Sequence, residues 1–267
     1  MRPIPSPTAL FPRLCFLALL APASAMPPPS PPPATAAASA AAVASTNAAA
    51  EYRVPLEIHI MSQCPDASFA FNHLVLPALH QLGEDKVDYR QSFIGSETPA
   101  GGVACKHGPD ECLGNTLHLC AAAQFPRPSL AYLPFTKCLL DDYGRVTDQE
   151  FVERCARDSG LDFQELNARA SRLGPGGGLD LLLESVRRSA EAGVKVSCTV
   201  RVEGRTVCVR DGGQWRDCPY GHGVADLVQL VEDAYRRGNQ PATGSSLQAA
   251  VEEARNAGRI DRMGEEL

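Results

Sequence analysis

Cysteines and polar residues whose side chains could take part in chemistry lie at fixed spacings in one stretch of this chain, residues 105–120, CKHGPDECLGNTLHLC. The stretch contains Cys105, His107, Gly108, Glu111, Cys112, Asn115 and Cys120. A second landmark, Cys64-Pro65-Asp66-Ala67, follows the strand-like run LEIHIM. Thiols can exchange disulfides with a substrate or brace a fold through bridges. Together the two segments predict thiol–disulfide chemistry beside a cysteine-braced insertion.

Cys64 stands where a predicted strand gives way to a predicted helix. Proline is favoured at the first helical position, so Pro65 places the Cys64 sulfur at the positive end of the helix dipole, where a thiolate is stabilised. We therefore predict that Cys64 attacks a substrate disulfide. A C-x-x-C motif would have its second cysteine at position 67, which is Ala67. Ser68 can hydrogen-bond the sulfur but cannot resolve a mixed disulfide, so we expect an external thiol such as glutathione or cysteine to do so.

Other interpretations of these cysteines remain open at this point. Cys64 could be an inert, buried apolar filler, or it could form a structural pair with Cys198. Within the 105–120 stretch, Cys105, His107, Cys112 and Cys120 have the ligand types of a zinc site. Their spacing differs from that of the common zinc fingers, and exported cysteines usually oxidise, so we favour structural disulfides and predict no metal site.

The apolar pattern predicts an α/β fold. Residues 56–60 alternate as a strand, residues 66–82 have helical spacing with a kink at Pro77 and an end at Gly83, and residues 87–94 form a second strand. Residues 104–173 carry five cysteines and several helical pieces. A helix through Leu179, Leu182, Leu183 and Val186, a hairpin over residues 198–209 and a helix over residues 224–235 follow. This order is the thioredoxin-like layout with a cysteine-rich helical insertion.

The cysteine count indicates disulfides and at least one free thiol. Removal of a predicted signal peptide takes away Cys15 and leaves nine of the ten cysteines, an odd number. We predict that Cys64 is the odd one. The short turn at residues 141–144 joins two predicted helices closely enough to predict a Cys138–Cys155 bridge. The disulfide candidates are Cys105, Cys112, Cys120, Cys138, Cys155, Cys198, Cys208 and Cys218.

Sequence composition divides the chain into four parts. Residues 1–25 resemble a signal peptide, residues 26–50 a disordered Pro/Ala linker, residues 51–238 the folded domain and residues 239–267 a polar tail. The apolar run of the signal is too short to span a bilayer, and no later run is longer, so we expect no membrane span. The net charge of −6 argues against nucleic acid and anionic membranes as partners. Apart from His107, we expect the histidines, including His59 and His118, to be ordinary surface or half-buried residues.

The 105–120 stretch resembles the signature of the gamma-interferon-inducible lysosomal thiol reductases and their fungal relatives, C-Q-H-G-x-x-E-C-x-x-N-x-x-x-x-C. Cys105, His107, Gly108, Glu111, Cys112, Asn115 and Cys120 match it, and Lys106 replaces the glutamine. The stretch SCTVRVEGRTVCVRDGGQW resembles fungal-type members, and the resemblance covers residues 56–235. It implies a thioredoxin-like fold and reduction of protein disulfides in a secreted or lysosomal/vacuolar compartment. It also implies a redox C-x-x-C, of which Cys64 matches the first cysteine and Ala67 replaces the second.

Two functional hypotheses follow. The first is a thiol–disulfide oxidoreductase that acts on disulfide-containing proteins through Cys64, with an external thiol as reductant. The second is a non-enzymatic secreted module, a thioredoxin-like shell that binds a partner after losing its second redox cysteine. Ala67 favours the second hypothesis, whereas the odd cysteine count and the helix-start position of Cys64 favour the first.

Overall fold

A mixed β-sheet lies at the centre of the fold in the computed structural model, which describes residues 51–240. The predicted signal peptide, the linker up to residue 50 and the tail from residue 241 onward lie outside the described residues. The strands are β1 Val54–Ile60, β2 Val87–Phe93, β5 Thr199–Val202, β6 Arg205–Asp211 and β7 Gln214–Arg216, in the spatial order β2-β1-β5-β6-β7. β1 and β2 are parallel, whereas β5 is antiparallel to both β1 and β6.

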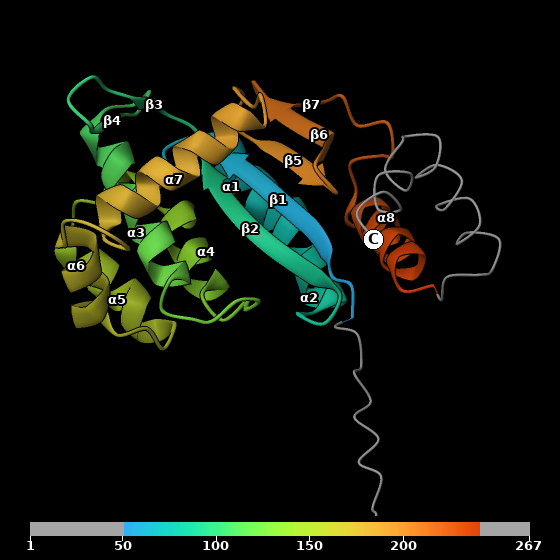
Figure 1. Cartoon of the computed structure of the whole chain (residues 1–267), viewed down its shortest axis with the longest axis horizontal. Coiled ribbons are helices and arrows are strands. Elements are labelled where there is room, and N and C mark those ends of the chain that lie inside the picture. The colour runs from blue at the N-terminus through green and yellow to red at the C-terminus, as the bar shows by residue number, and fades with distance from the viewer. Residues whose placement is uncertain (1–50, 241–267) are drawn as a thin grey trace, which may run out of the picture. The chain divides into compact units, whose positions relative to one another are not determined.

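This strand order and these directions confirm the predicted thioredoxin-like layout, with β7 as an additional edge strand. One face of the sheet is covered by α1 Pro65–Ala70, a π-helical turn Phe71–Val75, α2 Leu76–Leu82 and α8 Val224–Gly238. The other face is crossed by α7 Gly178–Glu191 (Figure 1). Gly83 has a φ of 72° and ends α2 as predicted, because glycine adopts a left-handed conformation without steric cost.

The predicted insertion lies between β2 and α7 and is largely helical (Figure 1). It consists of the short strands β3 Ser96–Glu97 and β4 Val103–Ala104 and the helices α3 Pro109–Ala122, α4 Leu133–Asp141, α5 Gln149–Asp158 and α6 Phe163–Ser171, with a 3-10 turn at Tyr143–Arg145. α3 packs against α7, α6 and α4. The insertion therefore shares its core with the sheet. No helix within residues 51–240 has the length and apolarity needed to cross a bilayer.

The buried face of α7 differs from the predicted one. Leu179 is exposed, and Ser185 and Ser189 are buried on the side that meets the sheet. Ser185 Oγ accepts a hydrogen bond from Phe93 N at 2.8 Å, and Ser189 Oγ donates one to Phe93 O at 2.8 Å. Because β2 is an edge strand, its last residue has no neighbouring strand on that side, and the two serines satisfy its backbone groups.

Two histidines that we expected at or near the surface are buried. His59 on β1 is 1% exposed, and its Nδ1 lies 2.9 Å from Ser189 Oγ. His118 on α3 is 2% exposed and stacks on Phe93 with ring centroids 5.6 Å apart. Both residues occupy positions that an apolar side chain would normally take, and only the packing of α3 and α7 on the sheet makes them interior.

Candidate active site around Cys64

Cys64 occupies the predicted junction between β1 and α1. It is the N-cap residue of α1, with Pro65 at the first helical position, and its carbonyl oxygen accepts hydrogen bonds from Ala67 N and Ser68 N at 3.0 and 3.2 Å. The residue is half-buried and its thiol is free. The sulfur is 3.6 Å from the carbonyl oxygen of Ser197, to which the thiol donates. Cys64 therefore presents a partly accessible thiol at the start of a helical segment, as nucleophilic exchange requires.

The residues after Cys64 have separate roles in the first turn of α1. Asp66 pairs with Arg210, whose Nε is 3.2 Å from Asp66 Oδ1, and the same oxygen accepts from Gly213 N at 3.1 Å. Ala67 is fully buried, so its methyl group faces the core. The Arg210 guanidinium also lies over the Phe69 ring, 3.5 Å from its centroid. The β6–β7 hairpin is thereby held against the helix that carries Cys64.

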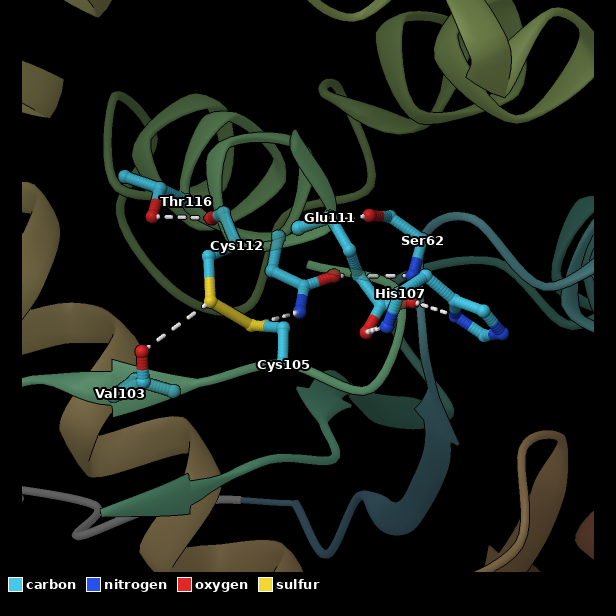
Figure 2. The surroundings of a disulfide bond; sticks show 8 residues. Ser62, Val103, Cys105, His107, Glu111, Cys112 and Thr116 are labelled. Carbon is cyan, nitrogen blue, oxygen red and sulfur yellow. Dashed lines mark hydrogen bonds and ion pairs between the residues drawn. A yellow bond between two sulfur atoms is a disulfide. The ribbon is translucent and has the colours of Figure 1, made fainter. Parts of the chain in front are cut away.

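The 105–120 stretch braces the loop that precedes Cys64. Asn115 Oδ1 accepts from Ser62 N at 3.0 Å, and Ser62 Oγ donates to the carbonyl oxygen of Glu111 at 3.1 Å. Figure 2 shows Ser62 meeting the first turns of α3. A Cβ atom at Gly114 would lie 2.6 Å from Ser62 Oγ, so glycine is required for this close approach. Asn115 and Glu111 both contact a residue about 50 positions earlier in the chain.

The remaining signature residues shape the start of α3. Glu111 is fully buried, and its carboxylate pairs with His107 Nδ1 and accepts from His107 N at 3.4 Å (Figure 2). His107 is thus tied to the turn before α3. Gly108 has a φ of 93°, a conformation that disfavours any residue with a side chain. These residues set the loop geometry from which the Ser62 contacts arise.

Three disulfides cross-link the described residues. Cys105–Cys112 ties the segment after β4 to α3, with Cα atoms 5.6 Å apart (Figure 2). The predicted Cys138–Cys155 bridge is confirmed and joins α4 to α5, with Cα atoms 5.7 Å apart. Cys208–Cys218 links β6 to the segment after β7. The Cys105–Cys112 bond uses two of the four ligands of the zinc alternative, and residues 51–240 contain no group of three or more potential ligands arranged to hold a metal.

Two disulfide candidates, Cys120 and Cys198, are free thiols in the structure, which corrects our expectation of four bridges. Both are fully buried. Burial raises the pKa of Cys120 to about 11 and also raises the pKa of Cys198, because a thiolate is poorly solvated in the interior. The structural pair Cys64–Cys198 is not formed. The nine cysteines of residues 51–240 therefore form three bridges and leave three free thiols. Of these three thiols, only that of Cys64 is accessible.

These environments predict the thiol count of the mature protein without residues 1–25. One equivalent of an alkylating reagent should react under native conditions at neutral pH, and peptide mapping should place it at Cys64. After denaturation without reductant, three equivalents should react, at Cys64, Cys120 and Cys198. Rapid native labelling of Cys120 or Cys198 would contradict the burial of these thiols.

The bond between Asn115 and Ser62 gives a second prediction. Asn115→Ala leaves the buried Ser62 N without its acceptor, which should lower the free energy of unfolding by about 1–3 kcal/mol and change the alkylation rate of Cys64. Denaturant unfolding and timed alkylation measure the two effects. The control is Asn72→Ala, which removes a solvent-exposed bond to Asp141 and should cost less than about 0.5 kcal/mol. Equal stability of Asn115→Ala and wild type would exclude the brace.

Comparison with known proteins agrees with this site. Residues 55–159, which include Cys64 and the 105–120 stretch, match the family of Gamma interferon inducible lysosomal thiol reductase (GILT). Membership in the fungal-type subgroup stays a prediction.

Two curated relatives each match about two fifths of this chain. GILT-like protein 1 of Drosophila melanogaster is 29% identical over 128 residues, which are 41% of this chain and 50% of that protein. A Gamma-interferon-inducible lysosomal thiol reductase-like protein of Anopheles gambiae is 26% identical over 123 residues, 41% of this chain and 51% of that protein. The chain thus spans about half the length of the curated relatives it matches.

Similar solved structures include the disulfide bond oxidoreductase DsbG of Mycobacterium tuberculosis, with 13% identity and a TM-score of 0.46 over 74% of this chain and 85% of that one. A thioredoxin-like oxidoreductase from Silicibacter pomeroyi has 18% identity and a TM-score of 0.44 over 70% and 88% of the two chains. The strand order and strand directions of this chain themselves define its thioredoxin-like fold.

Proposed function

We propose that this protein is a thiol–disulfide oxidoreductase that reduces protein disulfides with Cys64 as the nucleophile. The observation that carries the proposal is the position of Cys64. Among residues 51–240 it is the one free thiol that is not buried, and it starts the first helix of a GILT-family segment. The loop before it is held by residues of the family signature.

The proposed reaction begins when the Cys64 thiolate attacks one sulfur of a substrate disulfide. A mixed disulfide forms between Cys64 and the substrate, and the second substrate sulfur leaves as a thiolate and takes a proton. Ala67 has no sulfur with which to continue the exchange from α1. The two electrons for a complete turnover come from two molecules of an external thiol such as glutathione or cysteine, which are oxidised to one disulfide.

The surroundings of Cys64 support a protein as the substrate. Phe69 on α1 and Val196, which precedes the Ser197 contact, are each 39% exposed. Exposed apolar side chains on segments that meet at a reactive thiol favour binding of an extended or unfolded polypeptide. We place the activity in the secreted or lysosomal/vacuolar compartments, as the predicted signal peptide and the family of residues 55–159 suggest.

The rival function is a non-enzymatic secreted binding module, and one observation favours it. Ala67 is buried and occupies the position of the second redox cysteine. In that case Cys64 would bind no substrate sulfur, and the exposed apolar side chains would serve a partner instead.

A disulfide-reduction assay tests the proposal. Insulin is incubated with the mature protein and increasing glutathione at acidic and neutral pH, and samples are quenched with acid for mass spectrometry. We expect the rate of insulin reduction to rise with glutathione above the rate of glutathione alone, and an insulin-chain adduct to appear on Cys64. Absence of both the rate increase and the adduct at every pH would support the binding module.

A further inference from the structure

A second free thiol, Cys198, belongs to the residue that follows the Ser197 carbonyl contacted by Cys64. The Cys64 sulfur is 3.6 Å from the Ser197 carbonyl oxygen, and that carbonyl is part of the peptide group that joins Ser197 to Cys198. Ser197 Oγ also accepts from Met61 N at 2.8 Å, which holds the segment before β5 against the loop that carries Cys64. Cys198 belongs to the buried core cluster on which Cys64 packs. The end of β1 and the start of β5 thus bring two unbridged cysteines together.

We propose that Cys198 is the resolving cysteine of this reductase and takes the role that Ala67 cannot fill. The inference rests on the proposed function. The Cys198 sulfur attacks the Cys64 sulfur of the mixed disulfide, so that a Cys64–Cys198 bond forms and the bond from Cys64 to the substrate breaks. The substrate sulfur leaves with the electron pair and takes the proton that Cys198 gives up. Two molecules of an external thiol then reduce the Cys64–Cys198 bond and become a disulfide.

Burial of Cys198 suits this role. The residue has no exposed surface, so a protein disulfide cannot reach it, whereas the Cys64 sulfur becomes the electrophile that Cys198 attacks once Cys64 is bonded to the substrate. Cys198 therefore acts only after Cys64 has reacted. The third free thiol, Cys120, lies on α3 in the insertion.

The charged groups around Cys198 also favour its reaction after that of Cys64. Burial raises the pKa of Cys198 most, the negative charges of Cys64 and then Asp66 raise it further, and the Arg210 guanidinium lowers it. Once Cys64 has entered a mixed disulfide, its charge is gone, and one of the influences that keep Cys198 protonated is removed. Arg210 remains in place because its guanidinium pairs with Asp66 and lies over the Phe69 ring, while its backbone bonds to that of Cys198.

The first test uses the unmodified mature protein. It is incubated with oxidised glutathione, quenched with acid, denatured without reductant, alkylated and digested. We expect a linked peptide pair that contains Cys64 and Cys198, and a fall in the number of alkylated thiols from three to one, at Cys120. Glutathione on Cys64 together with a free Cys198 thiol in the same molecules would overturn the proposal.

Variants supply the second test. In Cys198→Ala the insulin adduct on Cys64 should persist, and its release at a fixed glutathione concentration should be slower by about tenfold or more, because the attack is no longer intramolecular. The control Cys120→Ala, which removes the other buried thiol, should release the adduct at the wild-type rate. The double variant Cys198→Ala/Ala67→Cys should regain fast release, which also shows that the Cys198→Ala background folds.

The outcomes separate the two proposals. If Cys198→Ala releases the adduct at the wild-type rate, the resolving role is overturned while Cys64 remains the nucleophile. If the wild type forms no adduct on Cys64, the proposed function itself fails, and the role of Cys198 fails with it.

Discussion

Replacement of Cys64 by serine should reduce insulin reduction to the rate of glutathione alone at every glutathione concentration. A serine hydroxyl is not ionised at neutral pH and cannot form a mixed disulfide, so the variant loses the first bond of the reaction. We expect a loss of about 100-fold or more in the protein-dependent rate, as for other nucleophile deletions. The assay described above, with the Cys64 peptide monitored by mass spectrometry, measures both the rate and the missing adduct.

The matched control is Cys120→Ser, which changes a thiol that the structure buries in the insertion. Its activity per folded molecule should equal that of the wild type. Full activity in Cys64→Ser would remove Cys64 from the mechanism. Equal inactivity of wild type and Cys64→Ser, with an active Ala67→Cys variant, would identify the natural protein as a disarmed reductase and favour the binding module.

Acidification should destabilise the fold through His118. Burial lowers the pKa of His118 to about 3, and the ring lies between Phe93 and Phe135. In the unfolded chain an ordinary histidine titrates near pH 6.5, so below that pH the unfolded state binds a proton that the folded state excludes. The free energy of unfolding therefore falls as the pH drops from about 6.5 toward 3. At pH 5 this residue alone accounts for a loss of about 2 kcal/mol.

Urea unfolding of wild type and His118→Gln at pH 7 and pH 5 measures this effect. The variant is expected to be less stable than the wild type at pH 7, because it disturbs a packed interior site. Its loss of stability between the two pH values should nevertheless be smaller by about 2 kcal/mol. His80→Gln, which changes an exposed histidine on α2, is the control and should keep the wild-type dependence. Equal pH dependence of wild type and His118→Gln would show that His118 takes up its proton equally in the folded and the unfolded state between pH 7 and pH 5.

The local elements that carry the candidate site follow from the amino-acid sequence. Alternation in residues 56–60, Pro65 at a helix start and Gly83 at a helix end place Cys64 between β1 and α1, because these signals act within a few residues. The Cys138–Cys155 bridge was predictable for the same reason, since a short turn leaves two consecutive helices few arrangements. The signature spacing of residues 105–120 likewise indicates the family from the amino-acid sequence alone.

Contacts between distant segments were decided only by the tertiary structure. Whether a cysteine is bridged depends on what packs beside it, and in the folded chain Cys120 and Cys198 are free thiols although both were disulfide candidates. The brace between Ser62 and Asn115 joins residues that no local pattern relates. The inward position of His118 likewise arises from the docking of α3 on β2 and α4.

The pairing of Cys198 with Arg210 is a contact that depends on the strand register, which local sequence patterns do not predict. Counting outward from the Glu203-Gly204 turn pairs Val202 with Arg205 and would place Cys198 opposite Val209. The strand register shifts by one between Val200 and Arg201, and Cys198 pairs with Arg210 instead. A bulge moves every later side chain to the other face of its strand. Local sequence signals therefore predict the helices and strands and the position of Cys64 at a helix start. The strand register and the packing of distant segments, which no local signal encodes, bring Cys198 and Arg210 close to it.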